Sequence, residues 1–592
     1  MRSDDIRKRF LDFFEKNGHK IVPSSPLLPT DPSVLFTTAG MQQFKEYYLG
    51  KPSPYGNKVV SCQKCFRTSD IEEVGDDTHL TFLEMLGNFS FGGYFKEETI
   101  KLAYEFLFKE LRLPLEDTIF TVFEDDPAKD LKQAVPADDE SILIWKKLGV
   151  SENKIKKCGK ADNFWGPTGE EGPCGPTTEI HLNGTEVWNL VFNEYYQDKN
   201  GKLTPLEQKG VDTGMGLERL AMIIRGKNSV YETDLFKPII EEIGKQSGYQ
   251  YKIDSKFLNT RAFRIIADHI KSSVFLASEG ILPSNVEQGY ILRKLIRRSI
   301  IYGNIGPRKL RDFLIPLASK VIEIYKSVYP EIKSKETDIL TIIQNEEERF
   351  EKVLEDSLKR AEKVFDWWSK IGLQDIRNTR ELAEKAFFLE QSGGLPIDLF
   401  VERLEKFWNE EIIFKDDFLV FVKELRKKHQ EISRAGAEKK FGGVGKEANY
   451  ESVKLHTATH LLHQALREIL GVHVKQMGSD ITPERLRFDF SHPQRMTDEE
   501  IKKVEDIVNQ KIKEDLDVKK EEMSYEKAIE SGALAFFKEK YPKTISVYSI
   551  DRFSKEICGG SHVNRTSELG RFKILKEESS GAGIRRIRAI LQ

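Results

Sequence analysis

The stretch Val211-Asp-Thr-Gly-Met-Gly-Leu-Glu-Arg219 predicts a strand that runs through glycines directly into a helix. Glycines at such a junction let the backbone approach a ligand closely, and the helix start carries an arginine. Upstream, residues 62–67 and 81–91 indicate two strands joined by a loop, with Arg67 on the first strand. An arginine fixed on a strand suits a bidentate grip on phosphate. Because no G-x-x-x-x-G-K-[ST] occurs, arginines on a sheet would have to hold any nucleotide.

The region around these strands predicts an α+β domain built on an antiparallel sheet, over residues 1–240. Short β-like runs at 118–123 and 186–192 alternate with Gly/Pro-dense loops and a helical stretch at 96–111. Residues 162–176 are so rich in glycine and proline that we expect a binding loop rather than a regular element.

Residues 241–447 are expected to form a helical domain. Phe350, Leu354, Leu358, Ala361 and Phe365 recur at three- and four-residue spacing between charged residues. The stretch 338–370 could form a coiled coil, but its apolar stripe is short, so a single long amphipathic helix is favoured. The glycines of Phe441-Gly-Gly-Val-Gly-Lys446 indicate a linker.

A third domain, again α+β, is expected over residues 448–592. It opens with a helix carrying histidines, followed by strands at 486–490, 545–550 and 583–591 and a helix at 498–514.

The composition of this chain of 592 residues indicates its cellular compartment. Five cysteines, no apolar leader and no apolar run near the roughly 18 residues of a membrane span predict a cytoplasmic protein without membrane insertion. The net charge of −3 gives no overall bias toward nucleic acid, so any RNA affinity must come from local basic patches.

Two histidine-containing motifs in the third domain indicate a zinc site. His456 and His460 lie four residues apart on one helix face, and the glycines before His562 allow a tight turn that aims it with Cys558 at one point. Such a His3Cys set suits zinc. His463 could compete for membership, and we treat it as a supporting or packing residue. The alternative is that these are core or solvated histidines.

The role of such a site stays open at this stage. Four protein ligands normally close a structural zinc site, whereas hydrolysis needs an open position for water or substrate. For Cys62 and Cys65, packed strand cysteines are favoured over a second zinc site, because no second ligand pair lies nearby in sequence.

Taken together, these motifs resemble the alanyl-tRNA synthetase family of class II aminoacyl-tRNA synthetases, along nearly the whole chain. The resemblance rests on Phe36-Thr-Thr-Ala-Gly-Met-Gln-Gln-Phe44, Glu84-Met-Leu-Gly-Asn-Phe-Ser-Phe-Gly92, the 211–219 stretch, and the paired motifs His456-Thr-Ala-Thr-His460 and Cys558-Gly-Gly-Ser-His562. It implies a class II catalytic domain, a helical domain that recognises the tRNA acceptor stem, and a zinc-containing editing domain.

The resemblance assigns the first domain to alanine activation with ATP and Mg2+. Arg67 is similar to the arginine that holds the α-phosphate, and Arg219 to the one on the far phosphate. The remaining residues of the ATP site are Glu84, Met85, Asn189 and Gly214. The alanine pocket comprises Met41, Trp165, Val191 and Asp212, with Asn189 as a polar partner and Asp212 as the carboxylate for the ammonium group.

A pocket for one methyl group rejects glycine or serine poorly, because a methylene or a hydroxyl changes binding by about 1–3 kcal/mol. The resemblance therefore implies that the zinc-containing domain hydrolyses mischarged seryl- or glycyl-tRNA, with Thr459 and Gln476 flanking its pocket. It also implies that Asn285 and Asp398 read the acceptor stem of tRNA(Ala). Arg293, Lys294, Arg297 and Arg298 are expected to form a phosphate-binding helix face, the alternative being a solvated face.

The sequence departs from the family pattern in three places. It lacks the small β-barrel with Gly-Gly-Gln before the histidine pair, it lacks the C-terminal domain that supports dimerisation in relatives, and the loop after Arg67 is short, without Gly-Lys-His. A monomer is expected. Two other functions remain open: an editing hydrolase with an inactive synthetase half, and a tRNA-binding relative without catalysis.

Overall fold

The computed structural model describes residues 1–592 except 30, 32, 125–134, 253–257, 305–309, 372–375, 396, 409–414, 439–448, 535–543 and 582–583. The chain forms two compact units, the first made of Met1–Lys370 and Phe388–Glu411, the second of Ile371–Phe387 and Ile412–Gln592. The predicted boundary at residue 240 therefore falls inside the first unit, and the division into three functional domains stays a prediction. The predicted linker at 441–446 lies outside the described residues.

In the described part of the first unit, nine strands form one sheet in the order β1-β2-β3-β9-β8-β7-β4-β5, with β6 paired to β7. The strands are β1 (Lys20–Ile21), β2 (Lys58–Phe66), β3 (Phe82–Phe91), β4 (Thr118–Phe123), β5 (Ile155–Cys158), β6 (Phe164–Trp165), β7 (Gly172–Leu182), β8 (Thr185–Gln197) and β9 (Leu203–Gly216). The pairs β1·β2 and β4·β5 are parallel, whereas the others are antiparallel. The predicted antiparallel sheet is confirmed.

The expectation of an irregular loop at residues 162–176 holds only for residues 166–171, because a helix ends at Asn163, β6 spans Phe164–Trp165 and β7 begins at Gly172. Two prolines are tolerated there because this end of β7 has a register shift between Cys174 and Thr177. Gly175 is required for another reason. A β-carbon on it would lie 1.8 Å from the carbonyl oxygen of Phe192 on β8.

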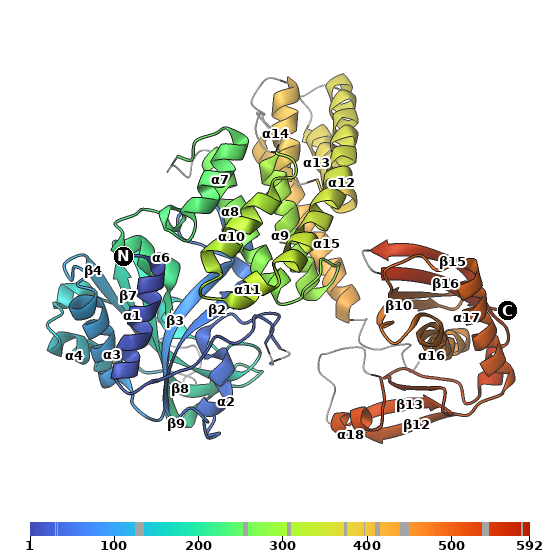
Figure 1. The fold of residues 1–592 in the computed structure, drawn as a ribbon, viewed down its shortest axis with the longest axis horizontal. Helices are drawn as coiled ribbons and strands as arrows, with labels where there is room; N and C mark the ends of the chain where they lie inside the picture. The colour runs from blue at the N-terminus through green and yellow to red at the C-terminus, as the bar shows by residue number, and fades with distance from the viewer. Residues whose placement is uncertain are drawn as a thin grey trace. The chain divides into compact units, whose positions relative to one another are not determined.

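Helices surround this sheet and continue beyond it (Figure 1). Those before the sheet's last strand are α1 (Ser3–Lys16), α2 (Lys45–Tyr48), α3 (Lys96–Tyr104), α4 (Asp139–Lys147) and α5 (Lys160–Asn163), with a π-helix at Glu105–Glu110. Those after it are α6 (Leu217–Ile224), α7 (Lys237–Ser247), α8 (Leu258–Ser278), α9 (Glu287–Gly303), α10 (Leu314–Tyr325), α11 (Pro330–Ser334) and α12 (Glu336–Ile371). The predicted helical stretch after residue 241 is confirmed.

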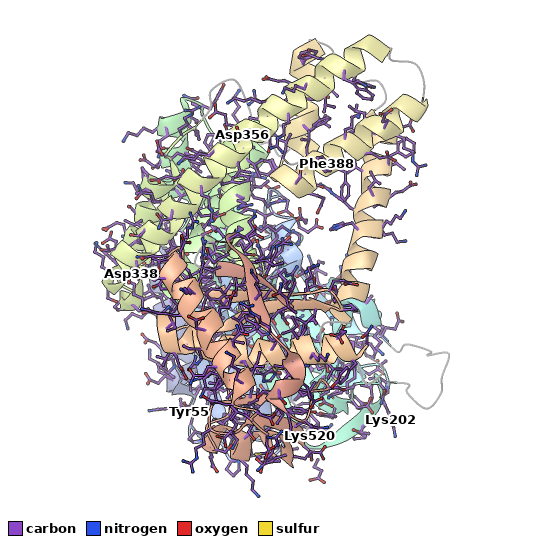
Figure 2. The ribbon with its side chains drawn as sticks, turned by 90° about the vertical axis from the view of Figure 1, so that its right-hand side faces the viewer. Tyr55, Lys202, Asp338, Asp356, Phe388 and Lys520 are labelled. Atoms are coloured by element: carbon purple, nitrogen blue, oxygen red, sulfur yellow. The ribbon has the colours of Figure 1, made fainter. Side chains whose placement is uncertain are left out.

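The long helix α12 is a single element of 36 residues, as its apolar periodicity indicates. Asp338 and Asp356 mark two points along it in Figure 2. Its apolar residues Phe350, Leu354, Ala361 and Phe365 are buried, so the helix is amphipathic and packed on its neighbours. The helices α13 (Ile376–Gly393), α14 (Ile397–Trp408) and α15 (Lys415–Glu438) follow it.

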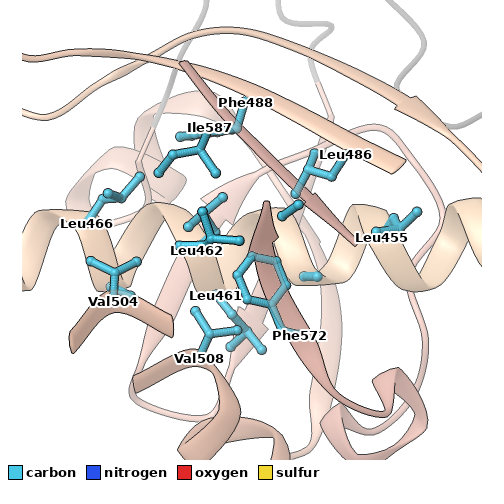
Figure 3. Packing of buried hydrophobic residues seen from close by; sticks show 14 of the residues in the cluster. Leu455, Leu461, Leu462, Leu466, Leu486, Phe488, Val504, Val508, Phe572 and Ile587 are labelled. Atoms are coloured by element: carbon cyan, nitrogen blue, oxygen red, sulfur yellow. The ribbon is translucent and has the colours of Figure 1, made fainter. Parts of the chain in front are cut away.

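The second unit builds its core on the helix α16 (Tyr450–Leu470), which packs on a sheet of order β10-β11-β16-β15 and on α17 (Asp498–Lys513). Figure 3 shows Leu461, Leu462 and Leu466 of α16 facing Val504 and Val508 of α17 in this core. The strands of this sheet are β10 (Gln476–Thr482), β11 (Arg485–Ser491), β15 (Phe572–Gly581) and β16 (Ile584–Leu591). A second sheet contains β12 (Val518–Met523), β13 (Ile545–Ile550) and β14 (Ser554–Ile557), with α18 (Tyr525–Glu530) beside it in sequence.

Candidate functional site

One face of the first unit's sheet forms the floor of a cleft. Successive side chains of a strand point to opposite faces, so each strand contributes residues two apart. The floor residues are Leu83 and Met85 of β3, Thr177 and Glu179 of β7, Val187, Asn189 and Val191 of β8, and Asp212, Gly214 and Gly216 of β9. The register places Val191 opposite Asp212 and Asn189 opposite Gly214. The structure thus brings together predicted residues that lie more than a hundred positions apart in the chain.

Both predicted arginines, Arg67 and Arg219, line this cleft. Arg67 lies one residue beyond the end of β2, and its Nε donates to the carbonyl oxygen of Thr38 at 3.4 Å. No carboxylate in the described residues lies within ion-pair distance of Arg67. Arg219 lies in the first turn of α6 and donates to the carboxylate of Glu186 at 3.0 Å. The cleft therefore offers one cation without a carboxylate partner and one that is already paired.

Asp212 is the acidic residue at the bottom of the cleft, 4% exposed. Burial raises the pKa of its carboxyl to about 7. Within the described part of the chain, no lysine, arginine or histidine forms an ion pair with it. A cationic ligand beside it would remove this penalty, because an opposite charge favours the ionised carboxylate.

Apolar walls enclose the space near Asp212. Trp165 and Val191 line the cleft, as predicted, whereas Met41 is fully buried beneath it in the cluster that also holds Met85 and Phe89. Met41 supports the pocket through this packing and does not line it. Asn189 lines the cleft and donates to Glu179 at 2.9 Å, while its Oδ1 is buried without a hydrogen-bond partner in the described structure.

Glu84 is not placed to bind a ligand in this cleft. Because Leu83 and Met85 point to the cleft, Glu84 points to the opposite face of the sheet. There it receives two hydrogen bonds from Arg7, at 2.8 and 2.6 Å, and one from the hydroxyl of Tyr329 at 2.9 Å. The expectation that its side chain contacts ATP does not fit this geometry.

The sequence interpretation missed several polar residues of the cleft: Asp70, Thr78, Asp162, Thr177, Glu179 and Glu186. For Thr177 and Glu179, the two-residue spacing on a strand was an available signal. Whether the other residues line the cleft depends on loop positions and strand pairing, which the sequence does not reveal.

In the second unit, His456, His460, Cys558 and His562 converge as predicted, with ligand atoms all within 4.8 Å of one another. The Sγ of Cys558 lies 3.4 Å from the Nε2 of His456 and 3.4 Å from the Nε2 of His562. Zinc bonds of the usual length in a tetrahedron place sulfur and nitrogen about 3.5 Å apart. These two sulfur–nitrogen distances fit ligands of one zinc ion, and the four residues are grouped closely enough to converge on it.

The other ring nitrogen of each histidine already has a neighbour. His456 Nδ1 lies 3.1 Å from the carbonyl oxygen of Ser561, and His562 Nδ1 lies 3.2 Å from the hydroxyl of Thr457. His460 Nδ1 lies 3.0 Å from a carboxylate oxygen of Glu556. All three rings thus direct Nε2 toward Cys558, which is the arrangement that metal-binding histidines require.

The protonation states of the metal-free site suit a metal in part. Burial raises the pKa of Cys558, but hydrogen bonds from His456, His460 and His562 outweigh it and lower the pKa to about 3. Burial, together with the nearby His460, lowers the pKa of His562 to about 3. Burial also lowers the pKa of His460, but Glu556 and Cys558 outweigh it and raise the pKa to about 10. At neutral pH the thiolate and the neutral ring of His562 are in the forms that bind zinc, whereas His460 must release a proton when the metal binds.

Thr459 and Gln476, the residues predicted to flank the editing pocket, occupy different settings. Thr459 is buried on α16 next to His460, and its hydroxyl donates to the carbonyl oxygen of Leu455 at 2.9 Å. Gln476 begins β10, and its amide donates to Ser479 at 3.2 Å. The ring of Tyr548, not predicted, lies 4.2 Å from that of His562.

The predicted tRNA-binding residues lie at and along α9, except for Asp398. Asn285 is exposed just before the helix, and its side-chain oxygen accepts a hydrogen bond from Arg293. Arg297 donates to Glu346 of α12 at 2.7 Å. Asp398 lies in α14, but its side chain is outside the described residues.

Two other cations of α9 share one carboxylate. Lys294 and Arg298 each lie 2.7 Å from Glu72, which belongs to the loop between β2 and β3. The expected phosphate-binding face is therefore neutralised in part by the chain's own acidic residues.

Comparison with known proteins agrees with these sites. The family model described as "tRNA synthetases class II (A)" matches residues 5–479, and the one described as "Threonyl and Alanyl tRNA synthetase second additional domain" matches residues 545–588. A protein of Borreliella afzelii named alanine--tRNA ligase is 46% identical over 100% of both chains. Proteins of the same name from Treponema pallidum and Dehalococcoides mccartyi are 44% and 36% identical, over 98% and 80% of their own lengths.

The fold, the cleft and these matches define a class II tRNA synthetase. Within that class, the chain belongs to the alanine--tRNA ligase family. In the described residues, no helix is both long enough and apolar enough to cross a membrane.

Proposed function

We propose that the cleft of the first unit activates alanine with ATP and transfers it to the 3' end of tRNA(Ala). The observation that carries this proposal is the juxtaposition of Asp212, a buried carboxylate with no cationic partner in the described chain, and Arg67, a cation with no carboxylate partner there. An amino acid carries the ammonium that Asp212 needs, and a nucleotide carries the phosphate that Arg67 suits. Alanine and ATP would each give one of these two groups a partner of opposite charge.

In this proposal the ammonium group of alanine pairs with Asp212, and its methyl group contacts Val191 and Trp165. Arg67 holds the α-phosphate while the alanine carboxylate attacks it. Fixed positive charge there stabilises the negative charge that grows on the phosphoryl oxygens. Arg219 holds the far phosphates, which leave as pyrophosphate. Met85 and Gly214 form the flat floor under the nucleotide.

Magnesium, bound with ATP, would neutralise part of the phosphate charge. Glu179, Glu186 and Asp70 are the carboxylates of the cleft that could approach it. A cytoplasmic location and a monomeric state are part of the same proposal.

We further propose that the second unit hydrolyses seryl- and glycyl-tRNA(Ala). His456, His460, Cys558 and His562 would hold zinc, which supplies Lewis acidity toward the ester carbonyl. A small alanine pocket calls for such a second site, since size alone excludes serine and glycine poorly. Thr459 and Gln476 are proposed to border the bound ester, and Asn285, Arg293, Arg297, Arg298 and Asp398 to contact the acceptor stem.

Alanine-dependent exchange of pyrophosphate into ATP tests the first site. Wild-type protein should catalyse exchange without tRNA, and Arg67→Ala should lower its kcat at least a hundredfold, the scale of one transition-state contact. An inactive synthetase half or a purely tRNA-binding protein predicts no exchange at all. The two alternatives differ from each other in whether seryl-tRNA is hydrolysed.

Deacylation of seryl-tRNA(Ala) tests the second site. Cys558→Ala should lose both bound zinc and hydrolysis, while pyrophosphate exchange continues at the wild-type rate. Undiminished hydrolysis by this variant would refute the proposed role of the metal.

A further inference from the structure

We propose that Glu556 is the positioning residue of the zinc site, fixing the ring of His460 and balancing the charge of the buried metal group. This inference rests on the proposed zinc site. Glu556 lies on β14, two residues before Cys558, and is 2% exposed. Its carboxylate faces α16, the helix that carries two of the three histidine ligands.

Each oxygen of this carboxylate contacts a different histidine of α16. Oε2 lies 3.0 Å from His460 Nδ1, within ion-pair distance but not aligned for a hydrogen bond, and Oε1 shares a hydrogen bond of 2.8 Å with His463 Nδ1. His460 and His463 are three residues apart and share one face of the helix. Glu556 therefore connects the strand that leads to Cys558 with the helix that carries His456 and His460. His463 contributes by holding the oxygen that His460 does not use.

The groups that contact the Nδ1 atoms of the three histidine ligands differ in charge. His456 meets a backbone carbonyl and His562 meets a hydroxyl, both neutral groups. His460 alone meets a carboxylate. A carboxylate on Nδ1 fixes which nitrogen binds metal and makes the ring a stronger donor.

Charge balance gives Glu556 its second role. A zinc ion, one thiolate and three neutral imidazoles carry one net positive charge. His456 and His460 are 8% and 4% exposed, so this charge would be largely removed from water. An uncompensated buried charge is costly. The buried carboxylate of Glu556 makes the group neutral.

Zinc affinity of the full chain tests this assignment, measured by competition with a chromophoric chelator. Glu556→Gln keeps the shape and removes the charge. The expected result is a loss of affinity of roughly tenfold to a hundredfold, the range for such outer partners of metal ligands. Asp489→Asn is the matched control: Asp489 is also a nearly buried carboxylate of the second unit, paired with Arg586 at 2.7 Å. That variant should bind zinc like the wild type.

The absorption spectrum of the cobalt-substituted protein supplies a readout independent of stability. Wild type and Asp489→Asn should show the same intense tetrahedral bands, and Glu556→Gln should show shifted or weaker ones because His460 is no longer held. Unchanged affinity and spectrum in Glu556→Gln would overturn the proposal, as would equal losses in both variants. If the wild-type protein bound no zinc, the zinc site itself would be wrong, a different failure.

Discussion

At the residue scale, the burial of the Asp212 carboxyl is expected to affect alanine binding through its pKa. Its pKa is raised to about 7 by burial, so in the empty protein it takes up a proton as pH falls through 7. An ammonium ligand needs the ionised form. Alanine binding therefore releases a proton below pH 7, and affinity falls as pH falls.

We expect the KM for alanine in pyrophosphate exchange to be nearly constant above pH 8 and to rise up to about tenfold per pH unit below pH 6.5. The KM for ATP, measured in the same series, is the internal control, since Arg67 and Arg219 remain charged throughout. A KM for alanine that is flat from pH 6 to 8 would contradict a role for Asp212 in binding the ammonium group.

Gly175 has a structural role that a single methyl group can test. A β-carbon there would lie 1.8 Å from the carbonyl oxygen of Phe192, which is backbone and cannot swing aside. Gly175→Ala should destabilise the protein by about 3 kcal/mol, at the upper end of overpacking costs. Gly166→Ala, where nothing lies within 4 Å of the added carbon, should melt within about 2 °C of wild type. Equal melting temperatures for the two variants would disprove the close strand approach.

Residue types and motif spacing indicated Arg67, Arg219 and the four metal-binding candidates, whereas Asp212, Trp165 and Val191 were expected from the resemblance. The structure brings each of these residues to one of the two candidate sites. Residue types and spacing did not predict the site residues whose position depends on contacts between elements that are distant in sequence. Glu179 enters the cleft only because β7 pairs with β8, and Glu556 reaches His460 only because β14 lies beside α16. Glu84 was expected in the ATP site, but its side chain points to the face of the sheet opposite to that of its strand neighbours Leu83 and Met85.

At the element scale, the loop between β2 and β3 is attached to α9 through Glu72. Burial raises the pKa of the Glu72 carboxyl. The nearby cations Lys294 and Arg298 outweigh burial and lower this pKa to about 2. The same cations are proposed to bind tRNA phosphates. Glu72 therefore competes with the RNA for them.

Glu72→Gln should tighten tRNA binding by up to about fivefold, the worth of an exposed ion pair. Glu73→Gln is the control, since it removes the same charge from the next position of the loop. Filter binding at one fixed salt concentration measures both. Equal effects of the two substitutions would show that only overall charge matters and that the pairing with α9 does not.

Periodicity predicted the helices and the regular strands, because α12 and α16 have apolar stripes and β8 is rich in β-branched and aromatic residues. It failed at residues 172–176, where glycine and proline normally end a strand. There, pairing with β8 overrides local preference. Such an override depends on a partner that is distant in sequence.

At the scale of the whole molecule, the two proposed sites lie in different compact units. The cleft proposed for aminoacylation lies in the first unit, and the group of possible metal ligands lies in the second. Removing zinc with a zinc-selective chelator should abolish hydrolysis of seryl-tRNA and leave the rate of pyrophosphate exchange within about twofold. Readdition of zinc should restore hydrolysis. Parallel loss of both activities would contradict this division.

The helix α16 begins at Tyr450, close to the residue 448 at which the third domain was expected to start, although the second compact unit already includes residues from Ile412 onward. The sequence did not predict that the helices from α7 to α12 pack into one unit with the sheet. Buried ion pairs between distant residues contribute to this packing, such as Lys271 of α8 with Glu218 of α6 at 2.6 Å. Composition carries no signal for such pairs.

The ion pair between Arg219 and Glu186 makes nucleotide entry an exchange of partners. A phosphate that approaches Arg219 competes with a carboxylate to which one guanidinium nitrogen already donates at 3.0 Å. The net gain is the difference between two ion pairs, so a singly charged anion such as chloride or acetate gains almost nothing. A polyphosphate carries several negative charges and therefore competes with Glu186 more effectively for Arg219. The cleft can therefore remain selective for nucleoside triphosphate in a cell full of small anions.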